Sequence, residues 1–290
     1  MTQGSGPSVS AYMHRQLEIV PENAAAFDAA VRMRDRRVGC VFVESLNREA
    51  RDCRIGGIIT ETDVIGKVLA QGRDPEVVTA GRIMSRPLLT IAPDRPMIDA
   101  GHLMERHHVR HLGVSDGDEI VGVISVRDLA RHFFEAPSGP VEALNDVYRP
   151  LGVLMQKQLE TIDAGAPAAA AATRMAERRI GSLFVVEAGE IVGIVTETDL
   201  VRKAVAGGPD PGSQRVGALL SSPLLDIDLN RSVRDACDVM AKHQVRHLTV
   251  RDQSAVVGVI SSRDLVRMIT ARDRPDFLRR TAEERTERRL

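Results

Sequence analysis

The sequence predicts an α/β protein built from four similar units, and two observations support this prediction. A glycine, two apolar residues, a hydroxyl residue and, three positions further on, an aspartate recur four times along the 290-residue chain. Like copies are evenly spaced, because Thr60 and Thr196 lie 136 residues apart, as do Ser125 and Ser261. The first and third copies share Thr-Glu-Thr-Asp, whereas the second and fourth share Ser-x-Arg-Asp. A unit of two repeats therefore occurs twice.

One local insertion interrupts this regularity in the first repeat. Val38-Gly39 and Ile180-Gly181 correspond at an offset of 142 residues, so extra residues must lie before Thr60. Residues 46–53 are rich in charge and predict a hairpin loop, for which the third repeat has only Ala188-Gly189.

Each repeat is predicted to run in the order β-α-β-β-α, and the second repeat shows this order most clearly. Residues 88–91 have a β-like composition, and apolar residues recur at helical spacing over 97–104. Strands at 109–114 and 120–124 flank a Ser-Asp-Gly-Asp turn, and a last helix begins at Ser125. The fourth repeat copies this order with a strand at 224–227, a helix over 233–240, strands at 245–250 and 256–260, and a last helix.

The repeats are predicted to form two modules of two repeats each. A lone segment of roughly 60 residues would bury only about 60% of its extended-chain surface, so we expect repeats to complete their core by pairing within a module. Residues 135–140 indicate a linker, and residues 141–157 predict a connecting helix interrupted by Pro150. The predicted boundaries are 11–135 for the first module, 136–157 for the linker and connecting helix, 158–271 for the second module and 272–290 for a charged tail.

The composition narrows the classes of partner. Lys and Arg number 39 against 40 Asp and Glu, which disfavours binding to nucleic acid or anionic lipid through a field of one sign. The three cysteines, Cys40, Cys53 and Cys237, form no closely spaced pair, which is typical of a reducing, cytoplasmic location. The most apolar stretch, 164–172, is short and rich in alanine, so no membrane span is predicted.

The hydroxyl and acid of the repeated element fit two roles. A hydroxyl at the N-cap and an acid three residues later can form a capping box that satisfies free backbone N–H groups. The same acid follows a strand and lies in the first turn of a helix, where the N–H groups and the helix dipole favour a phosphate. A short carboxylate can also accept both vicinal hydroxyls of a ribose. Sugar and phosphate together indicate a nucleotide.

Basic residues distinguish the even repeats from the odd ones. An Arg-His pair precedes the motif in repeats two and four, where the odd repeats have Gly39-Cys40 and Gly181-Ser182. A further arginine stands just before the motif acid, where the odd repeats have threonine. Each arginine could contact a phosphate, or could instead be solvated or paired with an acid. The pockets of odd and even repeats should therefore differ.

These residues resemble the cystathionine-β-synthase (CBS) domain, whose hallmark is a Gly-h-h-Thr/Ser-x-x-Asp end before the last helix, where h is apolar. The resemblance spans about Leu17 to Thr270 and implies four CBS repeats paired into two tandem Bateman modules, in a disc-like assembly. It implies regulatory binding of AMP, ADP, ATP or S-adenosylmethionine in clefts between repeats. By position it assigns ribose contacts to Asp63, Asp128, Asp199 and Asp264, ribose or phosphate contacts to Thr60, Ser125, Thr196 and Ser261, and phosphate contacts to Arg110, His111, Arg246 and His247. Arg127 and Arg263, which stand just before the motif acids, are further candidate phosphate contacts.

One departure from the family pattern affects the phosphate contacts. The even repeats resemble the His-Arg-Leu-Pro pattern of nucleotide-sensing kinase subunits, but they read Arg-His-Leu-Gly from Arg110 and Arg-His-Leu-Thr from Arg246. The order of the basic residues and the proline both differ, so the individual phosphate contacts stay open. We expect two occupied sites and not four.

The predicted function is that of a cytoplasmic sensor made only of CBS domains, which binds an adenine nucleotide as a regulatory ligand and signals to an unidentified protein target by repacking. A structural or scaffold protein that binds no ligand is the open alternative, and two chains could associate as a homodimer. No HExxH, nucleophile elbow, Walker loop or dinucleotide fingerprint occurs, so neither an enzyme nor a catalytic cofactor is predicted. No metal site is predicted at His107, His108 and His111, because the first two should point apart. The arginine-rich tail fits a solvated helix or a docking segment.

Overall fold

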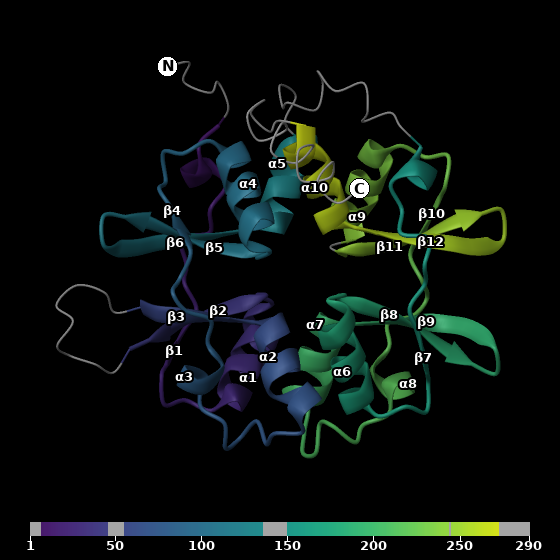
Figure 1. Ribbon diagram of the computed structural model, residues 1–290, viewed down its shortest axis with the longest axis horizontal. Helices are drawn as coiled ribbons and strands as arrows, with labels where there is room; N and C mark the ends of the chain where they lie inside the picture. The colour runs from purple at the N-terminus through teal and green to yellow at the C-terminus, as the bar shows by residue number, and fades with distance from the viewer. Residues whose placement is uncertain (1–6, 46–54, 136–149, 244, 273–290) are drawn as a thin grey trace, which may run out of the picture.

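The chain folds into four α/β repeats placed around a common centre, as the computed structural model shows (Figure 1). The structure describes residues 7–45, 55–135, 150–243 and 245–272. Each repeat has its own three-stranded sheet, in which the first two strands run parallel and the last two form an antiparallel hairpin. Four mixed sheets with flanking helices confirm the predicted fold class.

The first two repeats form one side of the molecule. The first contains β1 (Ile19–Pro21), α1 (Ala26–Arg36), β2 (Cys40–Glu44), β3 (Ile55–Thr60), α2 (Glu61–Lys67) and the 3-10 turn η2 (Leu69–Gln71). The second contains α3 (Ala80–Ile83), β4 (Thr90–Ile91), α4 (Met97–His107), β5 (His111–Asp116), β6 (Glu119–Ser125) and α5 (Val126–Glu135). The 3-10 turn η1 (Val9–Ala11) precedes both.

The other two repeats form the opposite side in the same order. After the 3-10 turn η4 (Leu151–Val153), the third contains β7 (Thr161–Asp163), α6 (Ala168–Arg178), β8 (Ser182–Glu187), β9 (Glu190–Thr196), α7 (Glu197–Asp199) and the π-helical continuation η5 (Leu200–Val205). The fourth contains α8 (Val216–Leu219), β10 (Asp226–Asp228), α9 (Val233–His243), β11 (His247–Asp252), β12 (Ala255–Ser261) and α10 (Ser262–Arg272).

Local sequence explains the hairpins. In the third repeat, Ala188 and Gly189 both have positive φ values of 50° and 87°, as a two-residue turn that matches the twist of β8 and β9 requires. In the first repeat, β2 and β3 also pair as an antiparallel hairpin. The predicted charged loop at 46–53 that joins them lies outside the described residues.

The helices bury one apolar stripe each. In α6 the buried side chains are Ala168, Ala171, Ala172 and Met175, which recur at the helical period, and the helix ends where Arg179 adopts a left-handed conformation. Small alanine side chains let this helix lie close to its neighbours. The same arrangement of buried positions occurs in α1 and α4.

The two largest buried clusters cross the boundary between the modules. One combines the helices and inner strand faces of repeats one and three, and the other combines those of repeats two and four. In Figure 1 the helices of each module accordingly face the helices of the other along the midline. The expectation that each core is completed within a module is therefore wrong for the helical layers, because each helix presents its stripe to the other module.

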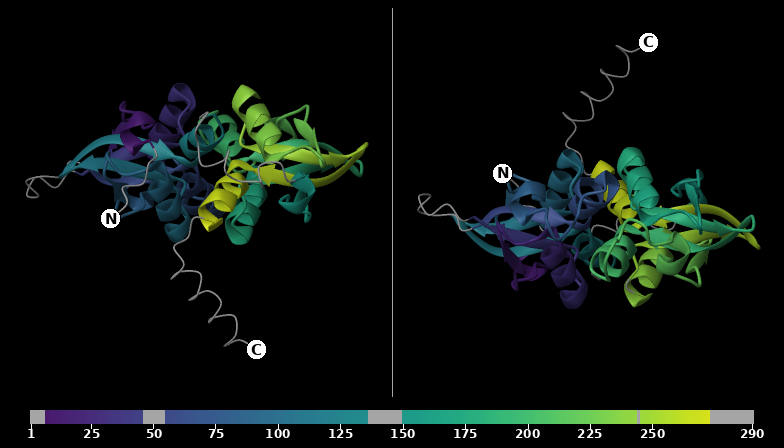
Figure 2. Two further views of the ribbon diagram at one scale, coloured as in Figure 1. Left: turned by 90° about the horizontal axis from the view of Figure 1, so that it is seen from above. Right: turned by 90° about the horizontal axis from the view of Figure 1, so that it is seen from below.

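Within a module, the repeats meet through their sheets and through exchanged chain segments. Cys40, Phe42 and Ile58 of the first repeat form a third buried cluster with apolar side chains that include Ile120 and Val123 of the second. The segment before each repeat bridges the last strand of its partner, as Ser85 does to Ile58, His14 to Val123, Ser221 to Ile194 and Gln156 to Val259. The edge views in Figure 2 show the two modules side by side in a flat assembly.

The segment before the third repeat differs from the prediction. Residues 150–157 contain only the short turn η4 and do not continue a connecting helix, since Pro150 begins a bridge to Ser232 and Gln156 pairs with Val259. Residues 136–149 lie outside the described residues. Across the described ranges, no helix combines the length and apolar character that a membrane crossing needs.

Leu129 tests the shared helical core. It is fully buried in the cluster formed by repeats two and four. We expect Leu129→Ala to lower the free energy of unfolding by about 2 to 5 kcal/mol, because the truncation leaves a cavity. Urea unfolding followed by circular dichroism measures this loss. Val77→Ala, at a side chain that is 74% exposed, is the control and should change stability by less than about 0.5 kcal/mol. Equal effects at the two positions would contradict the assignment.

Candidate functional site

A cavity of about 1580 Å³ lies at the centre of the assembly and is lined by residues of all four repeats. It exceeds the usual volume of about 300 to 1,000 Å³ for a pocket that binds one small molecule. The predicted residues on its wall include Thr60, Ser125, Ser261, Asp63, Asp128 and Asp264, together with all six predicted phosphate contacts. Thr196 and Asp199 do not line it. The repeat structure thus brings most predicted site residues to one place.

The wall of this cavity is positively charged. It carries eleven Lys and Arg side chains against eight Asp and Glu. The whole chain, by contrast, has a net charge of −1. A concave surface with an excess of one charge concentrates ligands of the opposite charge. The cavity is therefore suited to an anion.

All four hydroxyl-acid pairs cap the helix that follows them. In each repeat the Oδ2 atom of the aspartate accepts hydrogen bonds from the backbone N–H and the hydroxyl of the Thr or Ser three residues earlier. For Asp63 these distances are 2.8 and 2.7 Å. The capping role is thus present in every repeat, and it uses one carboxylate oxygen. The partners of the other oxygen distinguish the repeats.

In the odd repeats the second oxygen is held by a lysine and a serine. Asp63 Oδ1 lies 2.7 Å from both Lys67 Nζ and Ser85 Oγ. Asp199 Oδ1 lies 2.8 Å from Lys203 Nζ and accepts a hydrogen bond of 2.9 Å from Ser221. Both oxygens of each buried carboxylate therefore have partners within the protein.

In the even repeats the second oxygen contacts a side chain from the exchanged segment. Asp128 Oδ1 lies 3.0 Å from His14 Nε2, and Asp264 Oδ1 accepts a hydrogen bond of 3.1 Å from the Gln156 amide. The hydrogen bond to Asp128 raises the pKa of His14. Burial opposes ionisation of Asp128, but hydrogen bonds from His14 and Ser125 outweigh it and lower the pKa of this carboxyl. The His14 side chain is 62% exposed, so it can leave the carboxylate without opening the core.

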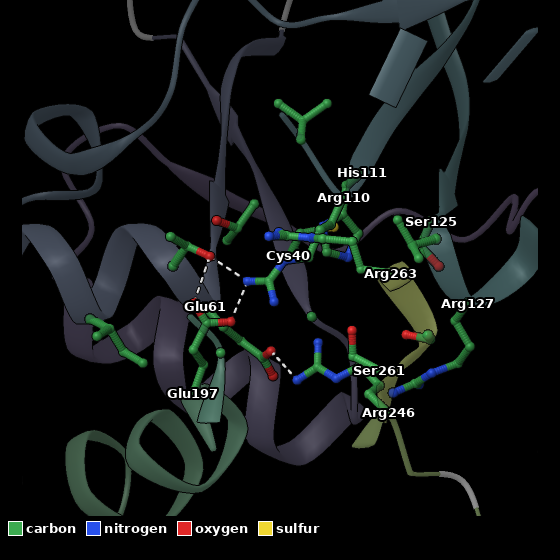
Figure 3. A pocket seen from close by; sticks show the side chains of 18 of the residues that line it. Cys40, Glu61, Arg110, His111, Ser125, Arg127, Glu197, Arg246, Ser261 and Arg263 are labelled. Atoms are coloured by element: carbon green, nitrogen blue, oxygen red, sulfur yellow. Dashed lines mark hydrogen bonds and ion pairs between the residues drawn. The ribbon is translucent and has the colours of Figure 1, made fainter. Parts of the chain in front are cut away.

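Two buried ion pairs join the modules at the centre of the cavity (Figure 3). Arg246 Nη2 lies 2.7 Å from Glu61 Oε2, and Arg110 forms the corresponding pair with Glu197. Each arginine also donates a hydrogen bond to a threonine of its own module, Thr62 for Arg110 and Thr198 for Arg246. Burial would raise the pKa of Glu61, but Arg246 and its neighbours reverse the shift and lower it. The predicted phosphate contacts Arg110 and Arg246 therefore already have carboxylate partners.

Arg127 and Arg263 differ from the central arginines. Both line the cavity that Ser125 and Ser261 also line (Figure 3). Neither forms an ion pair with another residue in the described part of the chain. Burial lowers the pKa of both guanidinium groups, and repulsion from Arg246 for Arg127 and from Arg110 for Arg263 lowers it further. These two cations are free to bind an anion.

The two half-buried histidines beside the central arginines, His111 and His247, carry no charge near neutral pH. Burial lowers the pKa of His111 to about 4 and that of His247 to about 3. The Nδ1 atom of His111 is buried without a hydrogen-bond partner among the described residues. A neutral imidazole can still donate one N–H to a ligand. Any phosphate contact by His111 or His247 would therefore be a hydrogen bond and not an ion pair.

Several residues of this site were not recognised in the sequence. They are Glu61 and Glu197, Lys67 and Lys203, Ser85 and Ser221, and His14 and Gln156. The two members of each pair occupy corresponding positions in the two modules. Aligning the modules beyond the motif would have shown identical residues in the Glu, Lys and Ser pairs, and histidine replaced by glutamine in the last pair. Among the residues that the structure describes, no group of three or more His, Cys, Asp or Glu is arranged to hold a metal ion.

Comparison with known families covers most of the chain. The CBS domain profile matches residues 9–70, 80–135, 151–206 and 216–271. The chain belongs to the CBS domain family. Four matches agree with the four sheets and with pairing into two Bateman modules.

Relatives in sequence are CBS proteins of several kinds. CBSCBSPB3 from Arabidopsis thaliana is 23% identical over 267 residues, which is 81% of this chain and 47% of the relative. YhcV from Bacillus subtilis is 33% identical over 111 residues, 38% of this chain and 79% of the relative. The chain thus spans about half the length of the Arabidopsis relatives that it matches.

Two solved structures share the arrangement of all four repeats. Protein MJ1225 from Methanocaldococcus jannaschii superposes with a TM-score of 0.74 at 16% identity, covering 91% of this chain and 100% of the other. An uncharacterised protein from Pyrococcus horikoshii gives a TM-score of 0.58 at 19% identity, with coverages of 90% and 99%. At these identities the likeness concerns the fold.

The contact between His14 and Asp128 predicts a pH-dependent contribution to stability. Because the folded-state pKa of His14 is raised, its stabilisation is complete below the unfolded pKa of 6.5 and is lost as the pH rises through the higher folded value. Because the pKa of Asp128 is lowered from 3.8, this carboxylate stays ionised in the folded protein down to a lower pH, and its stabilising contribution is lost only in stronger acid. We expect His14→Gln, which copies Gln156, to be less stable than the wild type at about pH 6 and equally stable at about pH 9. Urea unfolding at both pH values measures the difference, and a difference independent of pH would contradict the pair.

Proposed function

We propose that the protein is a cytoplasmic regulatory sensor that binds an adenine nucleotide or S-adenosylmethionine in the two even clefts. One observation carries the proposal. In each even repeat an arginine without an ion pair in the described part of the chain lines the same cavity as the motif hydroxyl and aspartate, and a side chain from the segment before the partner repeat contacts the second oxygen of that aspartate. The arginine suits a phosphate, and the carboxylate suits two sugar hydroxyls. The two groups together match a nucleotide better than either does alone.

The odd clefts fit this role less well. A ribose at Asp63 would have to displace Lys67 and Ser85 from Oδ1, which would leave the lysine without its carboxylate. Lys203 and Ser221 create the same obstacle at Asp199. A ribose at Asp128 has to displace only the exposed His14, and at Asp264 only Gln156. We therefore assign two occupied sites to Asp128 and Asp264.

The remaining groups of each even cleft complete the proposed contacts. Ser125 and Ser261 lie at the N-termini of α5 and α10, where backbone N–H groups favour a phosphate. Arg127 and Arg263 supply the charge. Val123 and Val259, which line the cavity on β6 and β12, offer an apolar wall for a ring. These are the contacts by which we propose that the ligand is oriented.

Signalling in this proposal uses the core shared by the modules. A ligand in an even cleft contacts the last strand, the following helix and the segment exchanged from the partner repeat, and α5 and α10 pack against each other across the module boundary. A ligand that binds one packing of these elements better than another shifts the equilibrium toward it. A protein target that recognises one packing would then respond to the nucleotide.

A scaffold role without ligand is the second candidate. It is supported by the caps, because the motif aspartate accepts a hydrogen bond from the backbone N–H of the Thr or Ser in every repeat and the pairs thus already have a structural use. On this view the repeats serve association only. The two candidates differ in whether an adenosyl compound stabilises the protein.

Ligand-induced stabilisation distinguishes a sensor from a scaffold. We expect at least one of AMP, ADP, ATP and S-adenosylmethionine to raise the melting temperature, because a ligand at 100 times its dissociation constant adds about 2.7 kcal/mol to the folded state. Differential scanning fluorimetry measures the shift, with guanosine monophosphate as a control for general anion binding. Mass spectrometry of the purified protein under non-denaturing conditions would identify a ligand that copurifies with it. Stabilisation by none of the four compounds would contradict the sensor.

Paired substitutions test the assignment to the even clefts. The double variant Asp128→Ala with Asp264→Ala should lose the ligand-induced rise in melting temperature, because both ribose acceptors are removed. Asp63→Ala with Asp199→Ala is the matched control: it removes two equivalent caps, with a similar cost of about 0.5 to 2 kcal/mol each, but should keep the ligand response. Loss of the response in the control variant alone would place the ligand in the odd clefts.

A further inference from the structure

Two glutamates at the centre of the cavity have no part in the sugar and phosphate contacts proposed above. Glu61 begins α2 and Glu197 begins α7, each as the second residue of Thr-Glu-Thr-Asp. The even repeats have Val126 and Ser262 at the corresponding positions. Side-chain exposure is only 2% for Glu61 and 7% for Glu197. Buried carboxylates of this kind require a charged or hydrogen-bonding partner.

Their partners come from the other module in both cases. Glu61 of the first module contacts Arg246 of the second at 2.7 Å, and Glu197 of the second contacts Arg110 of the first. Thr62 also donates a hydrogen bond of 3.0 Å to Glu197. The two pairs are related by the repeat symmetry, and they line the same cavity as the free arginines Arg127 and Arg263 (Figure 3). Ion pairs thus cross the module boundary in both directions.

We propose that Glu61 and Glu197 are internal counter-anions, which hold Arg246 and Arg110 until the phosphate chain of a ligand displaces them. A guanidinium group offers the same forked N–H groups to a carboxylate and to a phosphate, so the two compete for one position. The inference rests on the proposed nucleotide site and adds which part of the ligand the cavity selects. Adenosine or a monophosphate uses only the even cleft and its free arginine, whereas a polyphosphate chain extends to the centre and breaks a contact between modules. The number of phosphates then decides whether the packing of the modules changes.

The two glutamates are not equivalent, which sharpens the inference. Arg202 Nη2 lies 3.9 Å from Glu61 Oε1, and its Nε atom is buried without a hydrogen-bond partner among the described residues. The first repeat has Gly66 at the position of Arg202, so Glu197 has no second cation of this kind. Neutralising Glu61 therefore releases two arginines for an anion, and neutralising Glu197 releases one. The order of the effects can be measured.

The test uses the full chain and inorganic tripolyphosphate, which has the charge of a nucleotide chain without its base or sugar. Isothermal titration calorimetry at low ionic strength should show that Glu61→Gln binds tripolyphosphate about tenfold more tightly than the wild type, because a competing buried carboxylate has been removed. Glu197→Gln should give a smaller gain of about threefold. The affinity for adenosine should stay within about twofold in both variants.

Two further variants separate competition from general charge and from loss of the fold. Glu160→Gln removes the same charge from the cavity wall without touching either ion pair, and should leave the affinity for tripolyphosphate within about twofold. Glu61→Asp keeps the charge but shortens the side chain, so that it should also strengthen binding if the contact with Arg246 is what excludes the anion. This variant decides the question if thermal melting shows that Glu61→Gln does not fold.

The outcomes distinguish this inference from the proposed function. Unchanged or weaker binding of tripolyphosphate in folded Glu61→Gln or Glu61→Asp overturns the inference, even if adenosine or AMP binds normally and the sensor function stands. Equal gains in Glu160→Gln and Glu61→Gln overturn it as well, because a general charge effect would then account for both. Tighter binding of tripolyphosphate in the Glu61 variants, with no binding of any adenosyl compound, supports the counter-anion role and overturns the nucleotide sensor.

Discussion

Burial of a carboxylate at the start of a helix is the constraint on which this structure depends. The repeated motif buries the aspartate in the first three repeats and half-buries Asp264 in the fourth, and a buried carboxylate must be hydrogen-bonded or paired. The cap satisfies one oxygen everywhere. For the other oxygen, the odd repeats use Lys67 and Lys203 from the same helical region, whereas the even repeats use His14 and Gln156 from the segment before the module. The same motif therefore has its second carboxylate oxygen held by a lysine and a serine in the odd repeats, and by a single exposed side chain that a ligand could displace in the even repeats.

The same constraint explains why two modules associate. Odd repeats supply the central acids Glu61 and Glu197, and even repeats supply the central arginines Arg246 and Arg110, but each acid meets the arginine of the other module. A lone module would bury or expose both charges without their partners, and removing one partner of a buried pair typically costs about 3 to 5 kcal/mol. The helical clusters act in the same direction, since each combines repeats from both modules. Charge and apolar burial therefore specify the same assembly.

The local part of this architecture could be predicted from the sequence, because strand order, helical spacing and the motif are properties of short segments. The helix predicted from residue 97 begins at Met97 as α4, and the strand predicted at 120–124 lies within β6. The pairing across modules could not, because Arg246 and Glu61 are 185 residues apart and nothing local marks them as partners. Over residues 150–157 the prediction of a connecting helix was wrong for the same reason, since the bridge from Gln156 to Val259 outweighs local helix preference. The predicted roles of the candidate ligand residues stay predictions.

The unpaired arginines Arg127 and Arg263 distinguish a sensor from a scaffold better than the capping boxes do. Caps serve a sensor and a scaffold equally well, so their presence does not separate the two. Arg127 and Arg263 do separate them, because both guanidinium groups line the shared cavity without an ion pair in the described part of the chain. Burial together with a neighbouring arginine, Arg246 for Arg127 and Arg110 for Arg263, lowers the pKa of each group. A scaffold gains nothing from two such cations facing a shared cavity, and replacing them with neutral side chains would relieve the repulsion from Arg246 and Arg110. An anionic ligand relieves the same repulsion when it binds. The excess of positive charge on the cavity wall is therefore the physical argument for a phosphate-bearing ligand.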